Sequence, residues 1–338
     1  MKQVAIRVGV AQSTVSRILN GVEGRVPVTA ATRERVREAV RELGYRPHPL
    51  ARGLRGAGTS LVGLIVREIA DPFFAAAIEA VTGEARRHGY QLVLGHAESQ
   101  AGAVLALSEI LEMRHCDGLL VLGDVAEGPR LWEELRRDSR SVVGVCQGGR
   151  SPGVPTVNVD NRRGVELVMG HLHELGHRRI AFVDAGWGGD VAERRQAYLD
   201  LVAARGLEAD PAYLQAGTNA PAAGETSVHA LLGLARPPTA ILCATDQVAM
   251  GALAAAAARG LSVPRDLSVA GFDDIPIARY AIPALTTVRQ PVHEIMGVAL
   301  RLLLELVADG GTAPGVRLID PELVVRASTG PTPATVAG

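Results

Sequence analysis

Short apolar runs alternate with helical segments over most of this 338-residue chain. Apolar runs of strand length begin near residues 61, 91, 118 and 141, and the pattern restarts after residue 160 with runs near 180, 240 and 267. Strands that are apolar on both faces are typical of parallel sheets covered by helices on both sides. The repeat therefore predicts an α/β core of two similar lobes, each built on a doubly wound parallel sheet, that face each other across a cleft.

Polar residues at the ends of these strands are candidates for a ligand-binding site, because ligands in open parallel sheets bind beyond the carboxyl ends of the strands. Thr245 and Asp246 follow one apolar run, and Asp273 follows another. Gln290 lies where the chain is expected to cross between the lobes. Several polar side chains at strand ends favour a polyhydroxylated ligand. Each of these residues alone fits a solvent-facing loop or a helix cap equally well.

The first 45 residues show a different pattern, that of three short helices. Gly9 separates the first two, and the third is expected to run from the N-cap Thr29 to Gly44. One face of each helix is apolar, through Val4, Ala5 and Val8 in the first, Val15, Ile18 and Leu19 in the second, and Val36, Val40 and Leu43 in the third. This arrangement predicts a small helix-turn-helix domain.

The second helix has a polar face without Lys or Glu, made of Gln12, Ser13, Thr14, Ser16, Arg17 and Asn20. These residue types suit hydrogen bonding to base edges and phosphates. Residues 1–60 also contain 11 Lys and Arg against 4 Asp and Glu, whereas the rest of the chain contains 24 against 32. A basic domain on an acidic body indicates that the N-terminal part meets a polyanion, so we expect DNA as a partner.

The three cysteines, Cys116, Cys146 and Cys243, are widely spaced and form neither a disulfide framework nor a zinc pattern. We expect neither a signal peptide nor a membrane-spanning run. We therefore expect a cytoplasmic protein that associates with the nucleoid, without contact to a membrane. No cofactor, metal site or catalytic residue is expected.

The run GVAQSTVSRILNG and the later LGYRPHPLARGLR resemble the headpiece of the lactose-repressor (LacI/GalR-type) family of bacterial transcription regulators. The T-V-S-R-x-L-N core, with L-G-Y-x-P-x-x-L-A-R-x-L downstream, is highly specific, and the likeness extends from about residue 2 to about 328. The resemblance implies a periplasmic-binding-protein-like core. It also implies a sequence-specific repressor that binds a near-palindromic operator as a homodimer, or a higher oligomer, under the control of a small-molecule effector.

Individual positions match the functional residues of that family. Base-contacting positions correspond to Gln12, Ser13 and Arg17, and phosphate-contacting positions to Thr14, Ser16 and Asn20. The family's hinge helix, which places a leucine wedge in the minor groove, corresponds to Ala51, Leu54 and Arg55. Asp71-Pro72-Phe73-Phe74 looks like the family's N/D-P-F-F loop, and Arg194 begins a run similar to its R-x-x-G-F. The implied effector site is Asp71, Phe73, Phe74, Arg194, Thr245, Asp246, Asp273 and Gln290.

These patterns predict five parts of the chain. The expected domains are a headpiece over 1–45, a hinge over 46–59, a first lobe over 60–158 with about 291–317 returning to it, a second lobe over 159–290 with about 318–328 returning, and a flexible tail over 329–338. The tail shows no leucine heptads of a tetramerising coiled coil, and the choice between dimer and tetramer stays open.

Two other classes of protein are less compatible with the sequence. A solute-binding protein would share the core but not the basic headpiece, and an enzyme on this core would need a nucleophile or metal set that the sequence does not assemble. His173-Glu174-Leu175-Gly176-His177 matches the zinc-protease pattern H-E-x-x-H, but Gly176 is expected to end the helix before His177. The effector is expected to be a sugar or sugar derivative, with a nucleoside as the second choice. Whether it induces or co-represses stays open.

Overall fold

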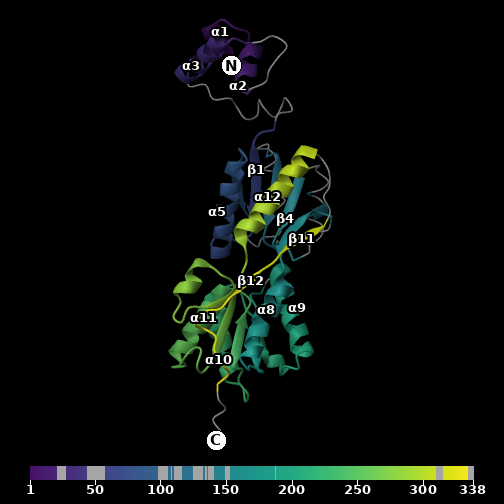
Figure 1. The fold of residues 1–338 in the computed structure, drawn as a ribbon, viewed down its shortest axis with the longest axis vertical. Coiled ribbons are helices and arrows are strands. Elements are labelled where there is room, and N and C mark those ends of the chain that lie inside the picture. Colours follow the sequence, from purple (N-terminus) through teal and green to yellow (C-terminus); the bar gives the residue numbers. More distant parts are fainter. Residues whose placement is uncertain are drawn as a thin grey trace. The chain divides into compact units, whose positions relative to one another are not determined.

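The computed structural model of the protein describes residues 1–20, 28–43, 58–97, 106, 107, 109, 116–124, 132, 133, 135, 141–148, 153–186, 188–309 and 315–333. The chain divides into two compact units, residues 1–59 and 60–338, whose elements are labelled in Figure 1. Among the described residues, no helix is long and apolar enough to cross a membrane. The hinge residues Ala51, Leu54 and Arg55 lie outside the described residues.

Three helices form the N-terminal unit: α1 (Lys2–Val8), α2 (Gln12–Asn20) and α3 (Ala30–Glu42). Their core consists of Val4, Ala5, Val8, Val15, Val36 and Ala39. Gly9 has a φ of 73°, a left-handed conformation that glycine adopts without steric cost and that lets the chain turn from α1 into α2. The predicted helix-turn-helix is therefore present.

The ends of these helices are satisfied by side chains. Thr29 caps α3, since its Oγ1 accepts a hydrogen bond of 3.3 Å from the Thr32 N–H. The Arg35 guanidinium donates to the Val8 carbonyl at 2.7 Å and satisfies the end of α1. Leu43 is 43% exposed, so the expectation that it faces the core is wrong. The reason is that α3 ends at Glu42, and Leu43 follows its last turn.

The first lobe of the core holds a six-stranded sheet in the order β11-β5-β4-β3-β1-β2. Its strands are β1 (Leu61–Val66), β2 (Gln91–His96), β3 (Gly118–Leu122), β4 (Ser141–Val145), β5 (Thr156–Val159) and β11 (Val316–Ile319), all paired in parallel. Helices α5 (Pro72–Arg87) and α12 (Val292–Asp309) pack together on one face (Figure 1). On the other face, Trp132 and Leu135 pack against Ile65.

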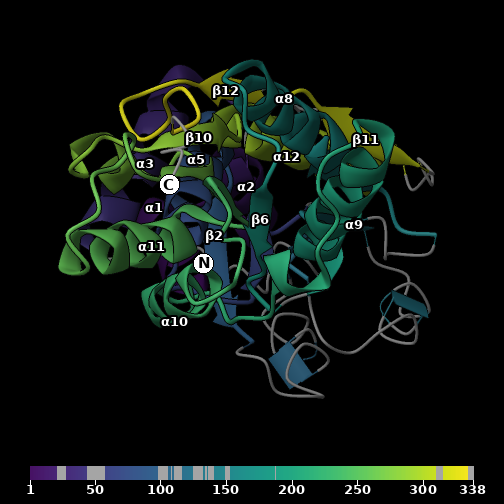
Figure 2. The same cartoon turned by 90° about the horizontal axis from the view of Figure 1, so that it is seen from below.

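The second lobe holds a six-stranded sheet in the order β12-β10-β9-β8-β6-β7. Its strands are β6 (Ile180–Val183), β7 (Leu214–Gln215), β8 (Ala240–Cys243), β9 (Ser268–Asp273), β10 (Thr286–Arg289) and β12 (Glu322–Val324). Figures 1 and 2 show α8 (Asn161–Glu174) and α9 (Gly189–Ala204) on one face, with α10 (Pro221–Leu232) and α11 (Asp246–Ala258) on the other. The other strand pairs of this sheet are parallel, and β12 runs antiparallel to β10 at its edge.

The chain passes between the lobes after β5, after β10 and after β11. Val159 and residues 318–319 still pair within the first sheet, one or two residues beyond the expected boundaries. Thr329 is buried, and the Thr332 N–H donates to the Leu175 carbonyl at 2.9 Å. The expectation of a flexible tail from residue 329 is therefore wrong for residues 329–333, because backbone hydrogen bonds join them to the second lobe.

Candidate functional site

The exposed face of α2 is the candidate surface for DNA. Gln12 and Ser13 are exposed, and Thr14 and Arg17 are partly exposed, with the Arg17 guanidinium 3.4 Å from the Thr14 hydroxyl. Ser16, in contrast, is only 8% exposed, which does not favour the phosphate contact expected of it. Asn20 ends the helix, and its side chain lies outside the described residues. No acidic side chain interrupts this surface, because α2 contains none.

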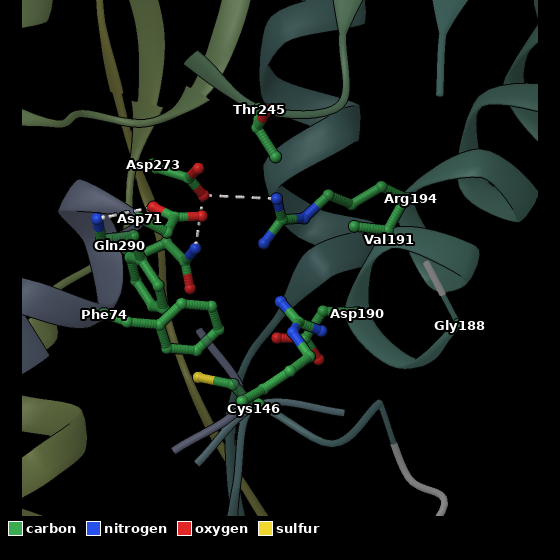
Figure 3. Close-up of a pocket in the computed structure, with 13 residues that line it drawn as sticks. Asp71, Phe74, Cys146, Gly188, Asp190, Val191, Arg194, Thr245, Asp273 and Gln290 are labelled. Carbon is green, nitrogen blue, oxygen red and sulfur yellow. Dashed lines mark hydrogen bonds and ion pairs between the residues drawn. The ribbon is translucent and has the colours of Figure 1, made fainter. Parts of the chain in front are cut away.

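A cavity of about 30 Å³ lies between the two lobes of the core, and Figure 3 shows the side chains around it. The first lobe contributes Arg67, Asp71, Phe73, Phe74, Gly123 and Cys146, and the second contributes Gly188, Asp190, Val191, Arg194, Thr245, Asp273 and Gln290. Most of these residues follow a strand or begin the next helix, as expected for a ligand site in an open α/β sheet. Typical small-molecule pockets measure roughly 300–1,000 Å³. A sugar-sized ligand therefore requires the lobes to separate or side chains to move.

Arg194 extends from α9 into this cavity (Figure 3) and is 3% exposed. Its Nε donates to Asn161 Oδ1 at 2.8 Å, and its Nη1 donates to the Ala244 carbonyl at 2.8 Å. The guanidinium carbon lies 3.7 Å from the centre of the Phe272 ring, and Nη1 is 3.3 Å from Asp273 Oδ1. These contacts hold the cation in one orientation and balance part of its charge.

Asp273 closes β9 with a backbone φ of 120°, and Asp274 follows with a φ of 55°. Residues other than glycine seldom adopt such angles, and the strain persists only where surrounding contacts impose it. Here the Asp274 carboxylate accepts hydrogen bonds from Arg289 Nε at 2.7 Å and from Arg326 Nη2 at 2.5 Å. With Asp274 held by these two arginines, the Asp273 carboxylate faces the cavity, where Gln290 Nε2 donates to it at 2.7 Å.

Burial raises the pKa of Asp273 to about 7, against the opposing effect of the Arg194 charge. Burial also raises the pKa of Asp71 and of Asp190. The cavity therefore concentrates carboxylates whose charged forms are poorly solvated. Removing a charge from water in this way is tolerated mainly where a cation or a hydrogen-bond donor compensates it.

Asp71, expected to bind a ligand, lines the cavity and accepts a hydrogen bond from the protein at each carboxylate oxygen. Oδ1 caps α5 by accepting from the Phe73 N–H at 2.8 Å, and Oδ2 accepts from Asn219 Nδ2 at 2.6 Å. The Asn219 side-chain oxygen in turn accepts from Thr245 Oγ1 at 2.7 Å. Asp71 belongs to the first lobe, and Asn219 and Thr245 to the second, so this chain of hydrogen bonds closes the cleft. No pattern in the sequence assigned this part to Asn219.

Asp246 does not line the cavity, although the sequence placed it in the effector site. It is fully buried, and its carboxylate accepts from Thr287 Oγ1 at 2.5 Å and from the Ile275 N–H at 2.9 Å. Thr245, the preceding residue, lines the cavity and caps α11. The structure therefore favours a structural role for Asp246, which ties α11 to the edge of the sheet.

The aromatic wall of the cavity is made by Phe73 and Phe74, whose ring centres lie 5.3 Å apart in an edge-to-face arrangement. Arg67 lies over the Phe74 ring, with its guanidinium carbon 4.9 Å from the ring centre. Cys146 is buried beside these groups, and burial raises the pKa of its thiol, which makes it a poor nucleophile.

Asp190 and Arg67 are charged residues that line the cavity and that no sequence pattern placed there. Helix α9 begins at Gly189, which places Asp190 in its first turn. An acidic residue in the first turn is itself a helix-start signal, because it complements the helix dipole. That signal, in the run GWGGD, was available in the sequence.

The zinc-protease pattern is not assembled. His173 lies in the last turn of α8, Gly176 follows with a φ of 92°, and His177 lies beyond the helix as predicted. His177 is buried, with Nδ1 2.9 Å from Thr239 Oγ1 and Nε2 3.0 Å from the Gly330 carbonyl. Within the described part of the chain, no group of three or more His, Cys, Asp or Glu side chains is arranged to hold a metal ion.

Together these features define a class of protein: a helix-turn-helix unit joined to a two-lobed core that closes over a polar cavity. The profile described as bacterial regulatory proteins, lacI family, matches residues 1–48, and that of the periplasmic binding protein-like domain matches residues 169–329. The HTH-type transcriptional repressor CytR of Escherichia coli K12 is 34% identical over 330 residues, covering 97% of this chain and 96% of the relative. The HTH-type transcriptional repressor PurR of Erwinia tasmaniensis is 34% identical over 332 residues, with the same coverage.

A crystal structure of the Lac repressor dimer bound to operator and the anti-inducer ONPF is similar to the fold of this chain, with a TM-score of 0.88 and 26% sequence identity. The match covers 97% of this chain and 98% of the repressor chain. The chain belongs to the lacI family of bacterial regulatory proteins. The resemblance noted from the headpiece motifs and the predicted fold class are thus confirmed.

Proposed function

We propose that this protein is a transcriptional repressor that binds a near-palindromic operator as a homodimer and responds to a small molecule in its cleft. The observation that carries the proposal is the exposed face of α2, where Gln12, Ser13 and Arg17 are accessible on a helix without acidic residues. Arg can bind guanine and Gln can bind adenine through paired hydrogen bonds in the major groove. In this proposal Thr14 and Asn20 contact phosphates.

The hinge supplies the second DNA contact in this proposal. Ala51, Leu54 and Arg55, which lie outside the described residues, would meet the minor groove, with Leu54 as a wedge that kinks one base step. Leu54→Ala is then expected to reduce operator bending and affinity while ligand binding to the core stays the same. Circular-permutation gel-shift assays of bending, with wild type in parallel, measure this effect.

In this proposal a small molecule in the cleft regulates operator binding. A ligand that enters between the lobes changes the hydrogen bonds that now join Asp71 and Asn219, and so changes the balance between open and closed cores. The relatives named above are repressors, and the Lac repressor was crystallised with both operator and a small anti-inducer. We infer a sugar or sugar derivative as the effector, with a nucleoside second. Because coupling is reciprocal, operator binding must change effector affinity by the same factor.

The direct test is a titration of the full chain against DNA from upstream of its own gene and against a scrambled duplex, at two salt concentrations. Binding to a palindromic segment with at least about a thousandfold preference over the scramble supports the proposal. Equal and steeply salt-dependent binding to both duplexes contradicts it, since that pattern indicates phosphate contacts alone. Sedimentation of the complex then gives the number of chains on each operator.

The protein is expected to act in the cytoplasm, on the nucleoid.

A further inference from the structure

Two hydrogen-bond acceptors in the cleft cavity have no partner among the described residues: Oδ1 of Asp190 and Oε1 of Gln290. Both residues are more than nine-tenths buried, with 8% and 3% of their surface exposed. Figure 3 shows them on opposite sides of the cavity. A buried acceptor without a donor destabilises the folded protein, so native structures rarely retain one without a function. Two such atoms facing one cavity indicate a ligand that donates to both.

The orientation of the Gln290 amide follows from its neighbour. Its Nε2 donates to Asp273 Oδ1 at 2.7 Å, and the reversed amide would instead place an oxygen against a carboxylate oxygen. Oε1 is therefore the atom left facing the cavity, and it can only accept. Asp190 is likewise an acceptor when ionised. A ligand that satisfies both residues must present hydrogen-bond donors, such as hydroxyl groups, on two sides.

The charges around the cavity disfavour an anionic ligand. Three carboxylates line it, those of Asp71, Asp190 and Asp273, against the two cations Arg67 and Arg194. Arg194 is already paired with Asp273. The N-terminus of the 16-residue helix α9 would attract an anion through its dipole, but Asp190 in the first turn already supplies a negative charge there. A phosphate group in this cavity would face carboxylates without an unpaired cation to compensate it.

We propose that the cleft ligand is an uncharged sugar or nucleoside whose hydroxyl groups donate to Asp190 Oδ1 and Gln290 Oε1, and that Asp190 excludes the phosphate esters of such compounds. This inference rests on the proposed function, because it names the ligand class of the same cleft. Burial raises the pKa of Asp190, against the opposing effects of the Arg194 charge and of a hydrogen bond from Asn161.

The first experiment is calorimetric titration of the full chain with four matched pairs: ribose and ribose 5-phosphate, glucose and glucose 6-phosphate, adenosine and AMP, cytidine and CMP. We expect binding by at least one uncharged member, and binding of its phosphate ester at least about thirtyfold weaker. A phosphate ester that binds as tightly as its parent compound, or more tightly, overturns the proposal, as does binding confined to the esters.

The second experiment compares Asp190→Asn with Asp200→Asn. Both residues lie on α9, but the Asp200 carboxylate lies outside the cavity and pairs with Arg162 at 2.7 Å. We expect Asp190→Asn to lower the affinity for the uncharged ligand at least tenfold. The ratio of this affinity to the affinity for the phosphate ester should also become smaller. Asp200→Asn is expected to change neither value. Equal effects of the two substitutions would overturn the assignment.

A third measurement does not depend on the identity of the ligand. If Asp190 serves the ligand, the protein without ligand keeps a buried carboxylate oxygen that accepts no hydrogen bond from the described residues, and Asp190→Asn raises the melting temperature. If Asp190 serves only the packing of α9, the same substitution lowers the melting temperature, and the proposal fails. Operator titration of the wild type is scored separately. If the chain binds uncharged compounds but no operator, the proposed function is contradicted and this inference is supported. If it binds an operator but prefers phosphate esters, the proposed function is supported and this inference is contradicted.

Discussion

Asn219 Nδ2 donates a hydrogen bond of 2.6 Å to Asp71 Oδ2, and this contact joins the second lobe of the core to the first. Each partner is held by its own lobe, since Asp71 caps α5 and Asn219 accepts from Thr245, the cap of α11. Two helix N-termini are thereby linked across the cleft through three side chains. The structure with this link intact leaves a cavity of only about 30 Å³, so it represents a closed core.

Asn219→Ala removes this link and is expected to shift the core toward an open form. The loss of one hydrogen bond to a charged group corresponds to about 1.5–3 kcal/mol, so ligand that binds the closed core should bind roughly tenfold or more weakly. Small-angle X-ray scattering without ligand should show a larger radius of gyration. Thr218→Ala, at the exposed preceding residue, is the control, and an equal effect of both would contradict the role of Asn219.

Gly148 and Gly189 form a second closing contact. Gly148 follows β4 in the first lobe, and a Cβ atom placed on it would lie 2.2 Å from the carbonyl carbon of Gly189, which begins α9 in the second lobe. Gly148→Ala is therefore expected to hold the lobes apart at this point. Scattering should again show an expanded core, and a ligand around which the lobes close should bind more weakly.

Gly89→Ala is the matched control for this substitution. Gly89 also has a positive φ, 77° against 57° at Gly148, but nothing lies within 4 Å of the Cβ position. Both alanines carry the roughly 1 kcal/mol cost of a left-handed conformation, and only Gly148→Ala meets the other lobe. Expansion of the core in both variants would show that backbone strain, and not the contact, is responsible.

Asp273 predicts a specific dependence of stability on pH. Its pKa is raised to about 7 in the folded protein from an ordinary value of 3.8, chiefly by burial. The folded state therefore keeps the proton to higher pH than the unfolded state. The resulting stabilisation is complete below about pH 4 and is lost as the pH rises through 7. Asp273→Asn removes this loss, so the stability of the variant relative to wild type should increase from pH 4 to pH 7.

Urea unfolding at unit steps of pH measures the free energy of unfolding of Asp273→Asn relative to wild type. This difference should grow by roughly 1 kcal/mol per pH unit. The slope of this difference against pH is what tests the prediction. The variant also loses its contact with Arg194, but that loss lowers its stability by an amount that depends less on pH. Asp200→Asn is the control. The pKa of Asp200 is lowered by its hydrogen bond to Arg162, so this group is ionised in both states above pH 5 and should add no slope. A flat profile for Asp273→Asn would show that Asp273 is ionised throughout.

Arg17→Ala is expected to weaken operator binding by roughly 1–3 kcal/mol and to relax specificity at one base pair. The physical reason is the loss of a paired hydrogen bond to a base edge. Titrations against a set of operators with single base changes measure both effects. Arg37→Ala, on the exposed face of α3 where Arg37 pairs with Glu34, is the control. Equal weakening on every operator would indicate that Arg17 contacts only phosphate.

The sequence predicted the recurring parts of the fold because periodicity is local. Alternating apolar runs predicted two sheets, and Gly9 and Gly176 were correctly expected to end helices, since left-handed positions favour glycine. Arg194, Asp273 and Gln290, all placed by strand ends or motif, do meet in one cavity. Leu43, the antiparallel β12 and the anchored residues 329–333 were not predicted, because their positions depend on contacts with distant segments.

The amino-acid sequence predicts the class of this protein, the order of its domains and the end of each sheet at which a ligand is expected to bind. Which polar side chains face the cavity depends on how the two lobes pack together. Thr245 and Asp246 are neighbours in the chain, yet one lines the cavity and the other is buried against Thr287. Asn219 and Asp190 gained their roles because the closed lobes bring them to the cavity. Side-chain direction at a strand end depends on the packing of both lobes, and no local pattern encodes that packing.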